Sequence, residues 1–122
     1  MDKKIQSFQD LVVWQKSHQL ALEIYRATKK FPKNEREALV PQIRRAISSV
    51  PAAIAEGFKR RNPKDKARLY NHGESFLEHA RYLLLLSRDL GYLKDFDVMW
   101  NLSDEVSRML SRLTRSARSH AR

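Results

Sequence analysis

Apolar residues along the chain recur every three or four positions, a spacing typical of amphipathic α-helices. No stretch alternates regularly between apolar and polar residues, so we predict no β-strands. Short stretches that contain proline or glycine divide the pattern into four segments. The predicted helices cover about residues 8–30, 35–60, 63–90 and 96–114.

Turn and capping residues mark the ends of the first segment and the start of the second. Ser7, followed three residues later by Asp10, forms a capping-box pattern at the first predicted helix start. Phe31-Pro32 ends this segment, because a residue before proline is pushed out of the α region. Asn34 then opens another capping-box pattern and predicts a helix from about residue 35. The predicted inward face of the first segment comprises Phe8, Leu11, Trp14, Ala21, Leu22, Ile24, Tyr25 and Thr28.

The later joints carry similar signals. Pro41 and Pro51 both fall inside the second segment, where we expect a bend rather than a break. Asn62 is the predicted N-cap of the third helix, Gly91 suits a left-handed position at its end, and Asp95 is the predicted cap of the fourth.

Joints this short place successive helices antiparallel. We therefore predict an all-α fold, an antiparallel up-down-up-down four-helix bundle that forms one domain over residues 1–122. The apolar pattern stops after Leu113, so we expect residues 115–122 to form a frayed basic tail. A three-helix bundle with a swapped helix is the structural alternative.

Composition narrows the possible functions. The 122 residues include no cysteine, which excludes disulfides, thiolate metal sites and thiol nucleophiles. The longest uninterrupted apolar run, residues 82–86, is much shorter than the roughly 20 residues that span a membrane, and no secretory signal opens the chain. We therefore expect a cytoplasmic protein without a membrane segment.

The chain is strongly basic, with 24 Lys and Arg against 14 Asp and Glu, a formal charge of +10. In the predicted bundle, both chain termini and the joint near residues 60–65 lie at one end, here named the terminal end. The other two joints lie at the opposite end, here named the far end. The sequence assigns twelve cationic side chains and two carboxylates to the terminal end, but seven cationic side chains and six carboxylates to the far end.

This uneven distribution favours a phosphate-binding surface at the terminal end, because clustered cations that neutralise phosphates release condensed counterions. A solvated end that only keeps the protein soluble is the alternative. No zinc-finger, RNP-like or helix-turn-helix motif is present, so binding would be directed at the nucleic-acid backbone with low sequence specificity. The candidate nucleic-acid-binding residues are Lys59, Arg60, Arg61, Lys64, Lys66, Arg68, Arg112, Arg115 and Arg118.

Catalytic and metal-binding motifs are absent from the sequence. There is no glycine-rich phosphate loop, no H-E-x-x-H motif and no E-x-x-H pair of the kind that holds iron in bundles. His72 and His79 share one helix face, but an exposed face explains them as well as a metal site does. Glu56 follows an apolar stripe, and we predict a partner for it in Arg60, Arg68 or Tyr70. We expect no enzyme activity, cofactor or metal.

Several motifs together resemble the 23S rRNA intervening-sequence protein family over residues 7 to about 113. They are Phe8-x-x-Leu11-x-Val13-Trp14-Gln15-Lys16, Phe31-Pro32 with Glu35 behind it, Gln42-Ile43-Arg44-Arg45-Ala46, Ser48-Ser49-Val50-Pro51-Ala52-Ala53-Ile54-Ala55-Glu56-Gly57, Ser75-Phe76-Leu77-Glu78 and Leu90-Gly91-Tyr92-Leu93. The family pattern usually has Asn where Ala53 stands and Gly where Glu74 stands. The motif residues to which we assign a structural role are Trp14, Gln42, Arg45, Ala55, Glu56, Gly57 and Glu78.

The resemblance implies a four-helix bundle that assembles into a ring-like homopentamer. It also implies kinship with the accessory proteins of diversity-generating retroelements, basic pentamers thought to bind nucleic acid and a reverse transcriptase. Our leading hypothesis is an oligomeric module that binds RNA or a ribonucleoprotein. A protein-interaction scaffold with no nucleic-acid ligand is the main alternative; a membrane-surface protein is disfavoured, because the core needs the apolar face of the last helix.

Overall fold

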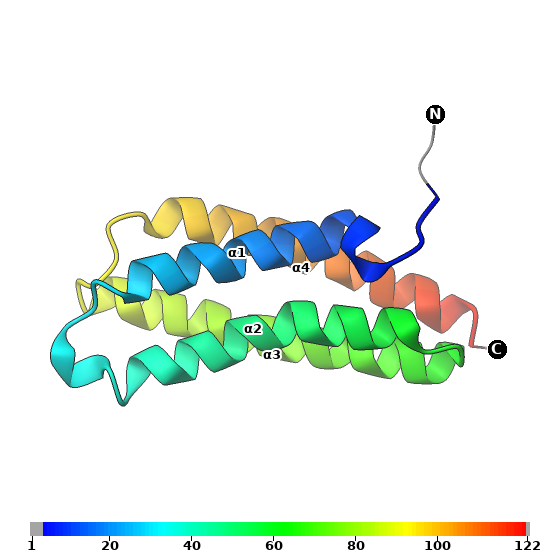
Figure 1. Cartoon of the computed structure of the whole chain (residues 1–122), viewed down its shortest axis with the longest axis horizontal. Helices are drawn as coiled ribbons and strands as arrows, with labels where there is room; N and C mark the ends of the chain where they lie inside the picture. The colour runs from blue at the N-terminus through cyan, green and yellow to red at the C-terminus, as the bar shows by residue number, and fades with distance from the viewer. Residues whose placement is uncertain (1–3, 122) are drawn as a thin grey trace.

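The computed structural model describes residues 4–121 and confirms the predicted antiparallel four-helix bundle (Figure 1). Two short 3-10 turns accompany the helices, and the described residues include no strand. In chain order the elements are η1 (Phe8–Asp10), α1 (Val12–Thr28), η2 (Lys33–Glu35), α2 (Leu39–Lys59), α3 (Pro63–Asp89) and α4 (Phe96–Ser119). No helix within the described residues is long and apolar enough to cross a membrane.

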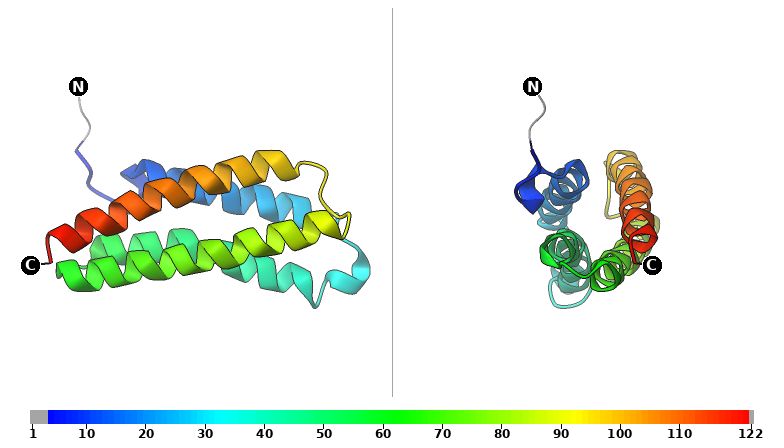
Figure 2. Two further views of the ribbon diagram at one scale, coloured as in Figure 1. Left: turned by 180° about the vertical axis from the view of Figure 1, so that it is seen from behind. Right: turned by 90° about the vertical axis from the view of Figure 1, so that its right-hand side faces the viewer.

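The helices form a closed ring in which each one contacts the helices before and after it, and α4 returns to contact α1 (Figure 2). η1, the joint between α2 and α3, and the last turn of α4 lie together at the terminal end (Figure 1). The joints that join α1 to α2 and α3 to α4 lie together at the far end. The predicted topology therefore gathers the segments that carry the candidate binding residues.

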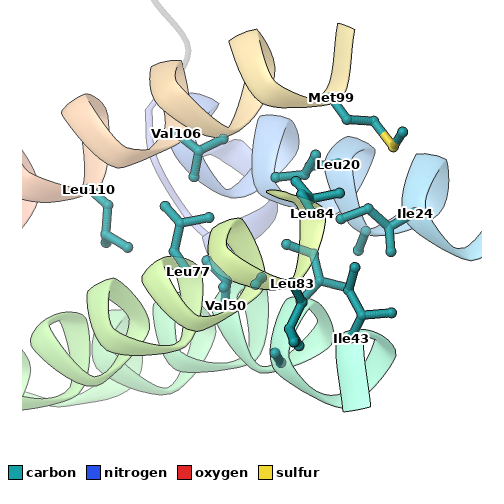
Figure 3. Close-up of a cluster of buried hydrophobic side chains, with 14 of the residues drawn as sticks. Leu20, Ile24, Ile43, Val50, Leu77, Leu83, Leu84, Met99, Val106 and Leu110 are labelled. Carbon is teal, nitrogen blue, oxygen red and sulfur yellow. The ribbon is translucent and has the colours of Figure 1, made fainter. Parts of the chain in front are cut away.

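The core runs along the bundle axis and consists almost entirely of aliphatic side chains from all four helices (Figure 3). Burying a leucine or isoleucine side chain contributes about 1.5–3 kcal/mol relative to leaving it exposed. The largest fully buried aliphatic side chains are Leu20, Ile24, Ile43, Ile47, Ile54, Leu77, Leu83, Leu84 and Leu110.

The first helix differs from its prediction. Ser7 and Asp10 do form a capping box, but it caps η1, and Leu11 then takes an extended conformation before α1 begins. The predicted continuous helix over residues 8–30 is therefore wrong. Leu22 and Tyr25 are 42% and 38% exposed rather than inward. Their apolar side chains lie on a second face of α1, which a broad apolar pattern in the sequence does not distinguish from the core face.

The second helix begins later than predicted, at Leu39 instead of residue 35. Residues near Asn34 form the 3-10 turn η2, and Ala38, with φ −119° and ψ −91°, separates that turn from α2. Pro41 consequently lies in the first turn of α2, where an N–H group has no partner within the helix. Pro51 is the one interior proline of α2, which continues through it to Lys59.

The predicted frayed tail is also wrong, because α4 continues to Ser119. Thr114 and Ala117 are buried, and the Thr114 hydroxyl donates to the Leu110 carbonyl at 3.0 Å. A threonine and an alanine thus extend the buried stripe, although the sequence pattern of large apolar residues ends at Leu113. Arg115 and Arg118 therefore project from a helix and not from an irregular tail.

Two of the three predicted caps at the later joints are confirmed. The Asn62 side chain accepts hydrogen bonds from the backbone N–H groups of Lys64 and Asp65 at 2.8 and 3.4 Å. Gly91 has a φ of +82°, a conformation that L side chains rarely adopt. Asp95 lies at the N-cap position of α4, but its side chain makes no capping hydrogen bond, so that prediction is wrong.

Candidate nucleic-acid interface

The nine candidate binding residues lie on the parts of α2, α3 and α4 that meet at the terminal end (Figure 1). α2 ends at Lys59, the joint contributes Arg60 and Arg61, and the first two turns of α3 contribute three more residues. The other three are the arginines on the last turns of α4. Eight of the nine are exposed, and Lys66 is half-buried.

Few of these cations are neutralised by the protein itself. Arg68 lies 3.9 Å from Asp65, and within residues 4–121 none of the other eight forms an ion pair. Elsewhere the bundle does pair its charges, as between Lys16 and Glu105 at 2.8 Å. The terminal end therefore presents cationic groups whose charge is open to an external anion.

The charge excess at the terminal end is smaller among the described residues than the sequence predicts. Lys3, Arg122 and Asp2 lie outside the described residues, and two carboxylates that the prediction did not assign to this end, Asp10 and Glu56, belong to it. The described part of this end has ten cationic side chains, which are the nine candidates and Lys4. It has three carboxylates, those of Asp10, Glu56 and Asp65, so the excess is seven positive charges. The end remains strongly positive.

Lys66 has a different environment from the other eight. Its ammonium Nζ donates to the Phe58 carbonyl at 2.9 Å and lies 5.4 and 5.7 Å from the ring centroids of Phe58 and Tyr70. Burial lowers the pKa of Lys66, because removal of water disfavours the charged form. Lys66 therefore joins α3 to the last turn of α2 instead of projecting into solvent.

A groove of about 330 Å³, here named the end groove, lies between these helices beside Lys66. From α2 and α3 it is lined by Phe58, Pro63, Lys66 and Tyr70. From α4 and the residue after it, it is lined by Leu113, Ser116, Ala117 and His120. The Tyr70 ring is 2% exposed, and burial raises the pKa of its hydroxyl to about 12.

Gly57 explains how the Tyr70 ring fits between α2 and α3. A Cβ atom at position 57 would lie 2.6 and 2.7 Å from two carbon atoms of the ring, closer than carbon atoms can approach. Gly73 performs a similar role further along, where a Cβ atom would lie 3.3 Å from the Ala53 Cβ. Gly57 and Gly73 therefore let α2 and α3 pack closely.

Glu56 does not have the partner that the sequence predicted. Its side chain is exposed, and within the described chain it makes no hydrogen bond or ion pair with Arg60, Arg68 or Tyr70. No group of three or more potential metal ligands occurs among residues 4–121 either.

Other motif residues lie along the side of the bundle. Trp14 is half-buried, stacks on His18 with ring centroids 4.9 Å apart, and together with Ala55 lines a second groove of about 450 Å³ between α1 and α2. This side groove is almost entirely apolar and also includes the exposed Leu22 and Tyr25.

The remaining motif residues are Gln42, Arg45 and Glu78, and all three are exposed. Gln42 reaches His79 of α3, with 3.4 Å between the two side-chain nitrogens. Arg45 contributes its carbonyl to the hydroxyls of Ser48 and Ser49.

The end groove was not predicted from the sequence. Its aromatic residues, Phe58 and Tyr70, lie next to cations, since Phe58 precedes the run Lys59-Arg60-Arg61 and Tyr70 lies one turn beyond Lys66. That proximity is a signal in the sequence. Ser116 and His120 carry no such signal, because they reach the groove only through the unpredicted last turns of α4.

The fold and the sequence both have relatives. A protein of unknown function from the S23 ribosomal protein family of Bacteroides thetaiotaomicron shares the fold with a TM-score of 0.75. The two are 22% identical, and the match covers 84% of this chain and 98% of the other. No curated protein matches the sequence. The model of the 23S rRNA-intervening sequence protein family matches residues 9–112, and the chain therefore belongs to that family.

Proposed function

We propose that the protein binds the phosphate backbone of nucleic acid through the terminal end and acts by binding rather than by catalysis. The observation that carries this proposal is the set of eight exposed Lys and Arg side chains at one end of the bundle. Among residues 4–121, Arg68 is the only one of the eight that is paired with a carboxylate. Neutralising phosphates with such cations releases condensed counterions, and this release supplies affinity without reading the sequence.

RNA is the first ligand to test. The family description refers to an intervening sequence of 23S rRNA. Six of the eight exposed cations are arginines, whose planar guanidinium groups can donate two parallel hydrogen bonds to a phosphate. Low sequence specificity follows from contacts that are confined to the backbone.

We further propose that the protein assembles as a homopentamer, as the resemblance to its family implies. The side groove between α1 and α2 supports this proposal, because its apolar lining would lose contact with water in an interface. Ala52→Glu places a charge in the groove at an exposed position and should shift the oligomer toward monomer in light scattering. An unchanged mass would exclude this groove from the interface.

The salt dependence of RNA binding tests the main proposal. We expect the logarithm of the binding constant for an RNA duplex to fall linearly with the logarithm of salt concentration, with a slope of about −0.9 per neutralised phosphate if RNA behaves as duplex DNA does. A flat dependence, or no binding at about 50 mM salt, would remove the proposal.

Charge reversal at the two ends provides a matched comparison. Arg60→Glu, Arg61→Glu and Arg115→Glu together should weaken RNA binding about 100-fold or more, since three phosphate contacts become repulsive. The control changes the net charge by the same amount at three exposed residues of the far end, with Lys29→Glu, Lys33→Glu and Lys94→Glu. This control should weaken RNA binding far less. Equal losses would show that only the net charge matters.

A protein-interaction scaffold is the second candidate, favoured by the apolar side groove. In that case the terminal-end variant should capture protein partners from a lysate as well as the unmodified protein does, with or without nuclease. Loss of capture on nuclease treatment would instead support the nucleic-acid proposal.

A further inference from the structure

The end groove combines an aromatic wall with a cationic group. Phe58 is half-buried at one side, the Tyr70 ring lies behind it, and the Lys66 ammonium lies within 6 Å of both ring centroids. Tyr70 is buried, so Phe58 is the ring that a ligand can reach. An accessible aromatic ring beside a cation is the feature on which unstacked nucleobases stack in single-strand-binding proteins.

Lys66 has hydrogen-bonding capacity left in this position. An ammonium group has three donors, and one of them is used by the Phe58 carbonyl. Within the described residues Lys66 has no carboxylate partner. The remaining donors of a half-buried cation can therefore meet an acceptor that enters the groove.

Several residues that line the groove are direct sequence neighbours of exposed cations of the terminal end. Phe58 is followed directly by Lys59, Pro63 by Lys64, and Ser116 follows Arg115. A polyanion held by these cations is thereby brought to the groove, so the charge of the surroundings complements a nucleic-acid strand. An acidic protein segment would match the charge but not the aromatic wall.

We propose that the end groove binds one unstacked nucleobase of a single-stranded RNA segment, with Lys66 donating a hydrogen bond to a carbonyl oxygen of the base. The flanking phosphates contact the exposed cations of the terminal end, so this inference rests on the proposed function. A base inside a duplex cannot enter, because its faces are stacked and its edge is paired. The volume of about 330 Å³ is at the small end of the range for ligand pockets.

The first test fills the groove without changing charge. Ser116 is exposed, so Ser116→Trp adds a large ring to the groove at a position that the core does not use. We expect binding of a labelled 12-nucleotide oligouridylate to weaken about tenfold in fluorescence anisotropy, the loss of one stacked base, and binding of an RNA duplex to stay within about twofold. Ser119→Trp, one turn on, exposed and outside the groove, is the matched control and should change neither.

A second test addresses Lys66. Lys66→Met should reduce binding of oligouridylate more than binding of oligoadenylate, because adenine has no carbonyl oxygen to accept the hydrogen bond. Lys64→Met removes a charge from an exposed position nearby and should weaken both strands equally. Circular dichroism melting of each variant establishes that the bundle is folded.

The outcomes separate this inference from the proposed function. If Ser116→Trp binds oligouridylate as the unmodified protein does while duplex RNA still binds, the groove does not hold a base and the backbone-binding function stands. If the unmodified protein binds neither RNA at about 50 mM salt, both proposals fail.

Discussion

The two ends of the bundle differ in how they use their polar groups. At the far end the Tyr92 hydroxyl donates to Glu35 at 2.9 Å, and Arg44 donates through Nη2 to the Tyr25 carbonyl at 3.1 Å and through Nε to the Thr28 hydroxyl at 2.9 Å. The first contact joins the two far-end joints to each other, and the other two join α2 to the last turn of α1. At the terminal end, Lys66 alone among the nine candidates makes an equivalent contact with the backbone of a neighbouring helix.

This difference shows how one fold can combine a closed end with an open one. The far end has nearly balanced charges and commits several of its polar side chains to internal hydrogen bonds. The terminal end relies instead on packing, with the Tyr70 ring fitted against Gly57, and leaves its exposed cations to solvent. Packing thus stabilises the end whose charges are available for a ligand.

Removing the ring that closes the terminal end should have the largest effect on stability. Tyr70→Ala should lower the free energy of unfolding by about 3–5 kcal/mol, through lost burial and the cavity left behind. Chemical denaturation measures this change. Tyr82→Ala on the same helix is the control, since that side chain is 59% exposed and its loss should cost less than about 0.5 kcal/mol. Similar losses in the two variants would contradict the role of Tyr70.

Crowding the contact between Gly57 and Tyr70 should have a smaller effect. Gly57→Ala should cost about 1–3 kcal/mol in the same measurement, because the new methyl group overlaps the ring. Combining Gly57→Ala with Tyr70→Leu should cost less than the sum of the two single changes, since leucine has no ring at the point of overlap. Strict additivity would show that the two positions do not compete for space.

At the far end, a glycine is required for its backbone conformation and not for space. Gly91→Ala should cost about 1 kcal/mol, because φ is +82° while no atom lies within 4 Å of the added methyl group. Gly91→Asn should recover part of this loss, since asparagine tolerates the left-handed region better than alanine does. If asparagine and alanine are equally destabilising, the conformational explanation is wrong.

The last expected effect is confined to alkaline solution, where Tyr70 contributes a pH dependence. Its folded-state pKa of about 12 is above the ordinary value of 10.0, so the stability linked to its proton is complete below pH 10 and is lost as pH rises toward 12. The unmodified protein should therefore lose more stability between pH 10 and pH 12 than Tyr70→Phe does. Thermal melting of both proteins across this range measures the difference; parallel curves would contradict it.

The sequence by itself determined the number of helices, their order and the uneven placement of charge. Apolar residues three and four apart force each segment to bury one face, and short joints force neighbours to run antiparallel. Asn62 and Gly91 marked their joints correctly, because an N-cap side chain and a left-handed glycine depend on local chemistry alone.

The tertiary structure decided the features that depend on contacts between helices. The burial of Thr114 and Ala117 extends α4, although neither residue is a strong apolar signal. Lys66 turns inward because Phe58 and Tyr70 lie beside it. Tyr70 is near it in the sequence, but Phe58 belongs to the preceding helix and reaches Lys66 only once α2 and α3 have packed together. Periodicity identifies the face that each helix buries, but the partner that a side chain meets, and the groove at the terminal end, exist only once three helices have packed together.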